Sequence, residues 1–326
     1  MIRLVTDELR PPGPPPKRHL ISVADLTRDD VERLLNTART FAASLDRNVK
    51  KLPTLKGHLV VNLFYESSTR TSSSFELAAK RLSADTMSIK SAGSSVDKGE
   101  SLKDTALTLG AYDPDVIVIR HPQIGAPQLV AQVTDAHVVN AGDGKHQHPT
   151  QALLDLYTLQ DALGRLTGLH VAIVGDVVHS RVARSLIQAF RLVGVRCTLV
   201  APPALLPRGI DVQATTEIGA IRDADVVYVL RMQHERIQPG ANYVPSLREY
   251  AACWGITPER LRPGQKVMHP GPMNRGVEID GRVADSGDAL IERQVRSGLV
   301  VRMAVLYDLL AGGPVAVQAL VAAEVA

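Results

Sequence analysis

Residues 59–82 read LVVNLFYESSTRTSSSFELAAKRL, and this stretch contains the strand, turn and helix that decide the fold class. The apolar run 59–64 has the length and composition of a buried strand. Farther on, Phe75, Ala78, Ala79 and Leu82 recur at the spacing of one helix face. The polar turn 67–72 between the two patterns therefore lies at the N-terminus of a helix.

This turn has the chemistry of an anion-binding site. The first turn of a helix carries N–H groups without backbone partners and the positive end of the helix dipole. Arg70 adds a planar guanidinium that suits phosphate oxygens. A serine- and threonine-rich helix cap beside a solvated arginine explains the same residues, so the turn alone leaves both interpretations open.

The alternation of strands and helices continues along the chain. We predict strands at 59–64, 86–89, 115–119 and 136–139, and helices near 27–44, 70–83, 101–111 and 124–133. A second series follows Pro149, with helices to about 163 and at 181–193, and strands at 169–174, 195–201, 226–230 and 266–268. Such alternation is typical of parallel sheets covered by helices.

We therefore predict an α/β chain of two domains, residues 1–149 and 150–298, each a parallel sheet flanked by helices. The length of 326 residues also favours two domains. The pattern at 299–322 is rich in Ala, Val and Leu and predicts a buried helix. We expect long helices to join the domains, and the C-terminal segment 299–326 to pack back on the first domain.

The composition excludes several classes of protein. A net charge of +3 and an aromatic content of 4% argue against a nucleic-acid binder, which typically has a clustered basic face or stacking aromatics. No apolar run reaches the length of a membrane span, and the N-terminus lacks the apolar core of a signal peptide. Two cysteines, Cys197 and Cys253, are typical of a reducing compartment. We expect a cytoplasmic protein.

Ligands of open α/β sheets bind beyond the carboxyl ends of the strands, so functional residues are sought there. The polar residues at these positions are Ser68 to Thr71, Arg120, His121, Asp143, His146, His148, Gly175, Asp176, His179, Arg181, Arg231, Gln233 and His269 to Pro272. We expect both domains to direct these groups into one cleft. The four arginines among them favour substrates with several negative charges.

Other chemistries have weaker support. Asp143, His146 and His148 are possible zinc ligands, but no recognised metal-ligand spacing accompanies them. The chain lacks a G-x-S-x-G elbow, a phosphate loop and a dinucleotide fingerprint. We therefore expect no metal and no cofactor. Transfer of a group from a phosphate-bearing donor to a small anionic acceptor remains, with Thr71, Arg120 and His148 as donors to a polarised carbonyl oxygen.

Seven motifs, spread in order over most of the chain, support this prediction of group transfer. They are Ser68 to Ser72, Ser94 to Ser101, Arg120-His121-Pro122, Gln147 to Gln151, Gly175-Asp176 with His179-Ser180-Arg181, Arg231-Met232-Gln233 and His269 to Pro272. In this order they resemble the aspartate carbamoyltransferases, from about residue 20 to 310. The resemblance implies carbamoyl transfer from carbamoyl phosphate to L-aspartate, a committed step of pyrimidine synthesis.

The resemblance also implies a role for each residue. Ser68, Thr69, Arg70 and Thr71 would bind the phosphate, Arg120, His148 and Gln151 the carbamoyl group, and the backbone of Gly271 and Pro272 would orient that group. Arg181 and Arg231, aided by Gln233, would hold the two carboxylates of aspartate. Lys98 would enter the active site of a neighbouring subunit together with Ser94, which implies a homotrimer with shared sites. The implied catalytic residues are Arg70, Thr71, Lys98, Arg120 and His148.

Two other functions explain part of the sequence, and one motif differs from the pattern of the family. The ornithine carbamoyltransferases share the fold, but they bind a cationic amino acid, which the positive charge of Arg231 would repel. A non-enzymatic phosphate-binding module explains the turn at Ser68 but leaves Arg181 and Lys98 without a role. Some aspartate carbamoyltransferases have leucine where Gly271 stands, which leaves the loop geometry open. Assembly with dihydroorotase or with regulatory chains also stays open.

Overall fold

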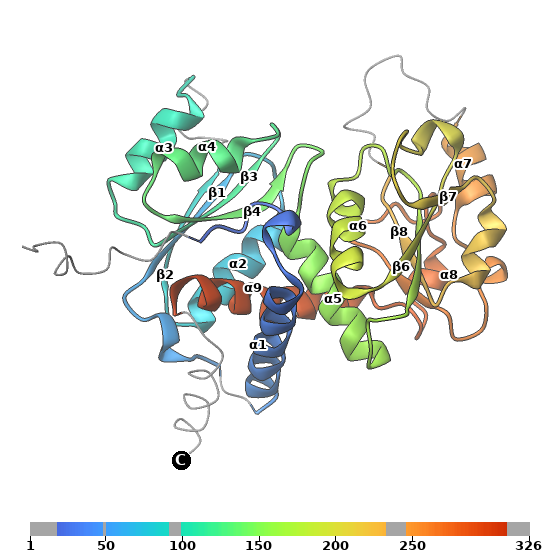
Figure 1. Ribbon diagram of the computed structural model, residues 1–326, viewed down its shortest axis with the longest axis horizontal. Helices are drawn as coiled ribbons and strands as arrows, with labels where there is room; N and C mark the ends of the chain where they lie inside the picture. The colour runs from blue at the N-terminus through green and yellow to red at the C-terminus, as the bar shows by residue number, and fades with distance from the viewer. Residues whose placement is uncertain (1–17, 48–49, 91–98, 233–245, 312–326) are drawn as a thin grey trace, which may run out of the picture.

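The computed structural model describes residues 18–47, 50–90, 99–232 and 246–311, which form two α/β lobes side by side (Figure 1). The first lobe has a four-stranded sheet of order β2-β1-β3-β4, and the second has a five-stranded sheet of order β7-β6-β5-β8-β9. Every pairing between these strands is parallel. The prediction of two helix-flanked parallel sheets is confirmed.

In the first lobe, helices cover both faces of the sheet. Its strands are β1 (Leu59–Phe64), β2 (Asp85–Lys90), β3 (Val116–His121) and β4 (His137–Asp143), and its helices are α1 (Arg28–Asp46), α2 (Thr69–Arg81), α3 (Leu102–Gly110) and α4 (Ala126–Val133). Figure 1 shows α3 and α4 on one side of the sheet and α1 and α2 on the other. Thr27 caps α1 through a reciprocal pair of hydrogen bonds with Asp30.

The second lobe repeats this construction around a larger sheet. Its strands are β5 (His170–Val174), β6 (Arg196–Val200), β7 (Gln213–Thr215), β8 (Val226–Val229) and β9 (Lys266–Met268), and its helices are α6 (Arg181–Val193), α7 (Leu247–Trp254) and α8 (Gly281–Ala284). The strand β7 and the helices α7 and α8 were not predicted. They are short, so their periodicity is too weak to separate them from loops.

Two long helices connect the lobes. They are α5 (Pro149–Leu163) and α9 (Ile291–Leu310), which pack against each other between the sheets, and α9 also contacts α1 and α2 of the first lobe (Figure 1). The prediction that the last helix packs back on the first domain is confirmed for its described part. The helix begins at Ile291, however, and not near 299, because its first turns carry exposed charges that hide the apolar pattern. Residues 312–326 lie outside the described ranges.

The strand register brings the carboxyl ends of β1 and β3 together. Phe64 on β1 pairs with Arg120 on β3, and the Tyr65 N–H donates to the Arg120 carbonyl at 2.8 Å. The chain therefore leaves β1 beside Arg120 before it turns into α2. None of the helices in the described ranges combines the length and apolarity needed to span a bilayer.

Candidate active site

A cleft of about 1000 Å³ opens between the two lobes. The residues that line it are Glu66 to Thr71, Ser74, Arg120, Pro122, Ile124, Gly144, Lys145, His148, Gln151, Leu154, Ser180 to Val182, Arg231, His269 to Met273, Ile291, Gln294, Val295 and Arg302. Strand ends of both sheets and the connecting helices α5 and α9 contribute to this set. The structure thus brings together every described residue that the sequence assigns to the two substrates.

The N-terminus of α2 opens into this cleft. Ser68 is the N-cap residue, yet its side chain makes no capping hydrogen bond. Thr71, in the first turn, is 6% exposed and lines the same wall. The interpretation of the turn as a serine-capped helix is therefore wrong for the Ser68 hydroxyl. The first-turn N–H groups of α2 are available to an anion.

Two arginines from different lobes face each other across the cleft. Burial, followed by the charge of Arg231, lowers the pKa of Arg70. The lowered pKa means that the charged form of Arg70 is destabilised by its surroundings. An anion bound near both guanidinium groups would relieve this destabilisation, so the electrostatics of the cleft favour an anionic ligand.

Glu66 joins the remaining two arginines. Its Oε2 accepts from Nε of Arg120 at 3.1 Å and from Nη2 of Arg181 at 2.6 Å. Arg120 belongs to the first lobe and Arg181 begins α6 of the second lobe. One carboxylate therefore connects the two lobes across the cleft. Both ion pairs are partly buried in the cleft wall, so neither arginine forms the exposed surface pair that a lone arginine usually makes.

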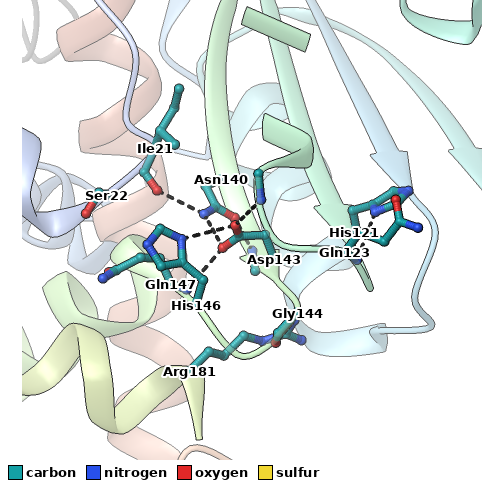
Figure 2. A network of polar contacts seen from close by, with 12 residues as sticks. Ile21, Ser22, His121, Gln123, Asn140, Asp143, Gly144, His146, Gln147 and Arg181 are labelled. Atoms are coloured by element: carbon teal, nitrogen blue, oxygen red, sulfur yellow. Dashed lines mark hydrogen bonds and ion pairs between the residues drawn. The ribbon is translucent and has the colours of Figure 1, made fainter. Parts of the chain in front are cut away.

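The first lobe shapes the space around Arg181. Its Nη1 donates to the Gly144 carbonyl at 3.2 Å, and only 3% of the residue is exposed (Figure 2). Gly142 has a φ of +121°, and a Cβ there would lie 2.8 Å from Cζ of Arg181. A glycine at 142 is required both by its backbone conformation and by the approach of this guanidinium.

Asp143 stabilises the loop after β4 from behind the cleft wall. Figure 2 shows its contacts: Oδ1 accepts from Asn140 Nδ2 at 2.8 Å and from the Gln147 N–H at 3.0 Å, while Oδ2 faces His146 Nδ1 at 3.2 Å. The expectation that Asp143 and His146 line the cleft is wrong. Within the described residues, no cluster of three His, Cys, Asp or Glu side chains is arranged to hold a metal ion.

Four further strand-end residues do not line the cleft and pack within the loops or against their neighbours. Asp176 and His179 are buried together, with Oδ1 and Nδ1 2.8 Å apart, in the turn that leads into α6. His121 packs against the Tyr65 ring, with ring centroids 4.5 Å apart. Gly175 is likewise absent from the cleft wall, because it packs against Tyr250 and Leu230. The strand-end rule selects these positions but does not tell which side chains face the ligand.

The connecting helix α5 begins in the cleft. His148 is its N-cap residue, and its N–H donates to Ser185 Oγ on α6 at 2.8 Å. Gln151, one turn later, is 8% exposed and lines the cleft. These two side chains therefore reach the cleft from the first turn of a helix that connects the lobes.

The loop after β9 closes another side of the cleft. Burial lowers the pKa of His269, which favours the neutral ring. Nδ1 of this ring accepts from the Gly271 N–H at 2.8 Å, so the proton belongs on Nε2, which faces Glu278 Oε1 at 3.3 Å. Gly271 has a φ of +60°, and a Cβ there would lie 2.7 Å from Cζ of Arg70. The loop therefore lies directly against the first turn of α2.

Three predicted site residues lie outside the described ranges. They are Ser94 and Lys98, in the segment 91–98, and Gln233, in the segment 233–245. Three charged residues of the cleft, Glu66, Lys145 and Arg302, were not predicted from the sequence. Glu66 directly precedes the serine-rich turn, and Arg302 is a single charge within an apolar helical run. These two positions in the sequence could therefore have marked both residues as candidates for the cleft.

Models of one protein family match the sequences of both lobes. Residues 18–161 match the model of the "aspartate/ornithine carbamoyltransferase, carbamoyl-P binding domain", and residues 167–309 match the "Asp/Orn binding domain" of the same family. Aspartate carbamoyltransferase catalytic subunits are similar in sequence. The one from Acidothermus cellulolyticus is 54% identical over 91% of this chain and 93% of its own length, and the one from Pelotomaculum thermopropionicum is 52% identical over 91% and 97%.

Solved structures of the same enzyme are similar in fold. Aspartate transcarbamoylase from Trypanosoma cruzi, in complex with carbamoyl phosphate and aspartate, has a TM-score of 0.81 and 32% identity over 89% of this chain and 96% of that chain. The catalytic subunit from M. Jannaschii has a TM-score of 0.79 and 37% identity over 90% and 98%. The extent of these matches, over both lobes and the cleft between them, shows that the chain belongs to the aspartate/ornithine carbamoyltransferase family.

Proposed function

We propose that this chain transfers the carbamoyl group of carbamoyl phosphate to the amine of L-aspartate, giving N-carbamoyl-L-aspartate and phosphate in pyrimidine synthesis. The observation that carries the proposal is the distribution of cations around one cleft. Arg70 and Arg120 come from the first lobe, and Arg181 and Arg231 come from the second. Two substrates with several negative charges require such a cleft, and the names of the similar enzymes support the same reaction.

The first lobe would bind carbamoyl phosphate. Ser68, Thr69, Arg70 and Thr71 would hold the phosphate at the N-terminus of α2, where backbone N–H groups and the helix dipole favour an anion. Arg120, His148 and Gln151 would hold the carbamoyl group, and the backbone of Gly271 and Pro272 would orient it. The contact of that loop with Arg70 supports a shared role for the two.

The second lobe would bind aspartate. Arg181 and Arg231 would each hold one carboxylate, because a guanidinium matches a carboxylate through two parallel hydrogen bonds. Gln233, together with Lys98 of a neighbouring subunit, would complete this half of the site. An acceptor with a cationic side chain would meet Arg231, so the arrangement favours aspartate over ornithine.

The reaction needs no covalent intermediate with the protein. The neutral amine of aspartate attacks the carbamoyl carbon, and the carbonyl oxygen becomes an oxyanion held by Thr71, Arg120 and His148. The bond from carbon to the phosphate oxygen then breaks, and the departing phosphate takes the proton from the amine. Positioning and oxyanion stabilisation are the main contributions of the protein.

We also propose the larger organisation. Residues 1–149, joined by the C-terminal segment 299–326, would form the carbamoyl-phosphate domain, and residues 150–298 the aspartate domain. The chain would act as a cytoplasmic homotrimer with shared active sites, because the implied position of Lys98 is in a neighbouring subunit. Dihydroorotase or regulatory chains are candidate partners of a larger assembly.

A product assay tests the proposal directly. The purified protein is incubated with carbamoyl phosphate and either L-aspartate or L-ornithine at millimolar concentration, and carbamoyl amino acids are measured colorimetrically. We expect carbamoylaspartate and no citrulline. A folded protein that makes neither product would disprove the transferase proposal, and citrulline alone would reassign the acceptor. Binding of N-(phosphonacetyl)-L-aspartic acid, measured by calorimetry, gives an independent readout of the two-part site.

A further inference from the structure

Asp155 is a wholly buried carboxylate beneath the cleft floor. It lies on α5, one turn after Gln151, and none of its surface is exposed. Its two oxygens accept hydrogen bonds from three side chains: Gln151 Nε2 at 3.1 Å, Gln294 Nε2 at 2.7 Å and the Tyr228 hydroxyl at 2.8 Å. These donors come from α5, α9 and β8, so one carboxylate joins both connecting helices to the sheet of the second lobe.

The carboxylate determines which way the Gln151 amide points. Nε2 of Gln151 donates to both oxygens of Asp155, at 3.1 and 3.3 Å. The amide nitrogen is therefore directed down to Asp155, and Oε1 is the amide atom left for the cleft that Gln151 lines. An exposed carbonyl oxygen accepts a hydrogen bond, so this orientation suits the NH₂ group of a carbamoyl substrate.

Gln294 links Asp155 by hydrogen bonds to the loop after β9. Its Nε2 donates to Asp155, and its Oε1 accepts from the His269 N–H at 3.0 Å. His269 in turn accepts the Gly271 N–H through Nδ1 at 2.8 Å. A continuous series of hydrogen bonds thus runs from Asp155 to the Gly271 backbone, which also lines the cleft.

We propose that Asp155 is a positioning residue for the carbamoyl group, because it fixes the amide of Gln151 and, through Gln294 and His269, the backbone of Gly271. This inference rests on the proposed function and assigns a role to a residue that does not line the cleft. An acceptor is required at this position, since all three surrounding groups donate. A neutral amide at 155 replaces one of the two acceptor oxygens by an NH₂ group, so the hydrogen bonds from Gln151, Gln294 and Tyr228 cannot all keep their present arrangement.

The surroundings of Asp155 predict that kcat depends on pH. Burial raises the pKa of Asp155 to about 7, against the hydrogen bonds from Gln294, Tyr228 and Gln151 and the charge of Arg302. Arg302 on α9 and Tyr228 on β8 are the charged and titratable groups that face it. Below this pKa the protonated carboxyl must donate one hydrogen bond, so it no longer accepts all three. Wild-type kcat should therefore fall as pH drops through about 7.

The test is a double-mutant cycle with Asp155→Asn and Gln151→Ala, each assayed alone and together. We expect Asp155→Asn to lower kcat/KM for carbamoyl phosphate by about tenfold, the order expected when a buried partner is lost. The combined loss should be smaller than the product of the two single losses, because both substitutions remove the same orientation of residue 151. The ionisation near 7 should disappear from the kcat profile of Asp155→Asn.

Thr158→Val is the matched control. Thr158 lies on the same buried face of α5, and its Oγ1 is 2.8 Å from Ser297 Oγ on α9, so this variant also loses a buried hydrogen bond between the two helices. We expect Thr158→Val to lower Tm and keep wild-type kinetics. Activity that falls in proportion to Tm in both variants would show a merely structural role for Asp155.

The outcomes separate this inference from the proposed function. If the wild-type protein makes carbamoylaspartate and Asp155→Asn has unchanged kinetics, only the inference is disproved. Losses that multiply in the double variant would also disprove it. If the wild-type protein makes no carbamoylaspartate, the proposed function fails, and the inference fails with it.

Discussion

Glu66 is the only carboxylate lining the cleft within the described residues, and it holds two of the four arginines that the substrates would need. Its contact with Arg181 crosses from the first lobe to the second. Hydrogen bonds between charged groups contribute about 1.5–3 kcal/mol each when partly buried. Glu66 therefore contributes both to the orientation of the arginines and to the distance between the lobes.

Replacing Glu66 by glutamine tests this dual role. Glu66→Gln keeps the side-chain shape but removes the charge that attracts Arg120 and Arg181. We expect kcat/KM for aspartate to fall about tenfold, the loss that corresponds to about 1.4 kcal/mol, with little change in Tm. Steady-state kinetics with varied aspartate provide the measurement.

Glu76→Gln is the control for this substitution. Glu76 forms an exposed ion pair with Lys80 on α2, at 2.6 Å, and exposed pairs of this kind contribute little. We expect wild-type kinetics for this variant. Equal activity of the two variants would show that the charge of Glu66 has no part in aspartate use.

Arg231→Ala separates the two halves of the cleft. If Arg231 holds a carboxylate of aspartate, its loss should raise KM for aspartate at least about tenfold, because a charge-assisted guanidinium contact is lost. The dissociation constant of carbamoyl phosphate should stay nearly constant, since Arg70 and the α2 N-terminus remain. Calorimetry measures the dissociation constant of carbamoyl phosphate, and steady-state kinetics measure KM for aspartate. An equal loss of both would contradict the assigned role.

At the scale of elements, α9 places a buried arginine under the cleft. Arg302 is 4% exposed, its Cζ lies 5.1 Å from the centre of the Phe75 ring, and its buried Nε has no hydrogen-bond partner among the described residues. Burial lowers its pKa to about 10. Gly298 makes room for it one turn earlier, since a Cβ there would lie 2.5 Å from Nη1 of Arg302. A glycine inside a helix costs about 0.5–1 kcal/mol relative to alanine, so its presence here has a packing reason.

We expect Gly298→Ala to displace the Arg302 guanidinium and to lower both Tm and activity, despite the better helix propensity of alanine. Overpacking of a dense interior costs about 1–3 kcal/mol, which exceeds the propensity gain. Thermal denaturation followed by circular dichroism and the product assay measure the two effects.

Gly110→Ala provides the comparison for that substitution. Gly110 ends α3, and the nearest atom to a Cβ there is 3.8 Å away, an ordinary van der Waals distance. This variant should be as active as the wild-type protein and at least as stable. A stabilised Gly298→Ala with full activity would show that the position of Arg302 is not constrained by the glycine.

At the scale of the whole molecule, the two lobes share one cleft, and the proposed trimer would share it with a third element, Lys98 of a neighbouring chain. Mixing Lys98→Ala subunits with Arg70→Ala subunits tests this sharing. In a closed ring of three, each mixed trimer has one site built from two intact partners, so purified mixed trimers should regain about one third of wild-type activity.

The activity of the separate variants and the composition of the mixed trimers, checked by native mass spectrometry, are the controls for this experiment. Each variant alone should be nearly inactive. Verified mixed trimers with no more activity than the separate variants would contradict the shared site.

Much of the fold followed from the sequence because its signals are local. The apolar run 59–64 and the helical spacing from Phe75 to Leu82 each act within a few residues, so their elements are present where predicted. The short β7, α7 and α8 were missed, and α9 was predicted to begin too late, because a few residues or a charged first turn give no clear period.

The sequence by itself determined the alternation of strands and helices, the ordered motifs and hence the family. Only the tertiary structure decided which strand-end side chains enter the cleft. Arg120 and Arg181 enter it, whereas Asp143 and His179, at equivalent positions, turn back to hold their loops. The roles of Glu66 and Asp155 also needed the tertiary structure, because a carboxylate's role depends on which donors surround it, and those donors come from elements far apart in the chain.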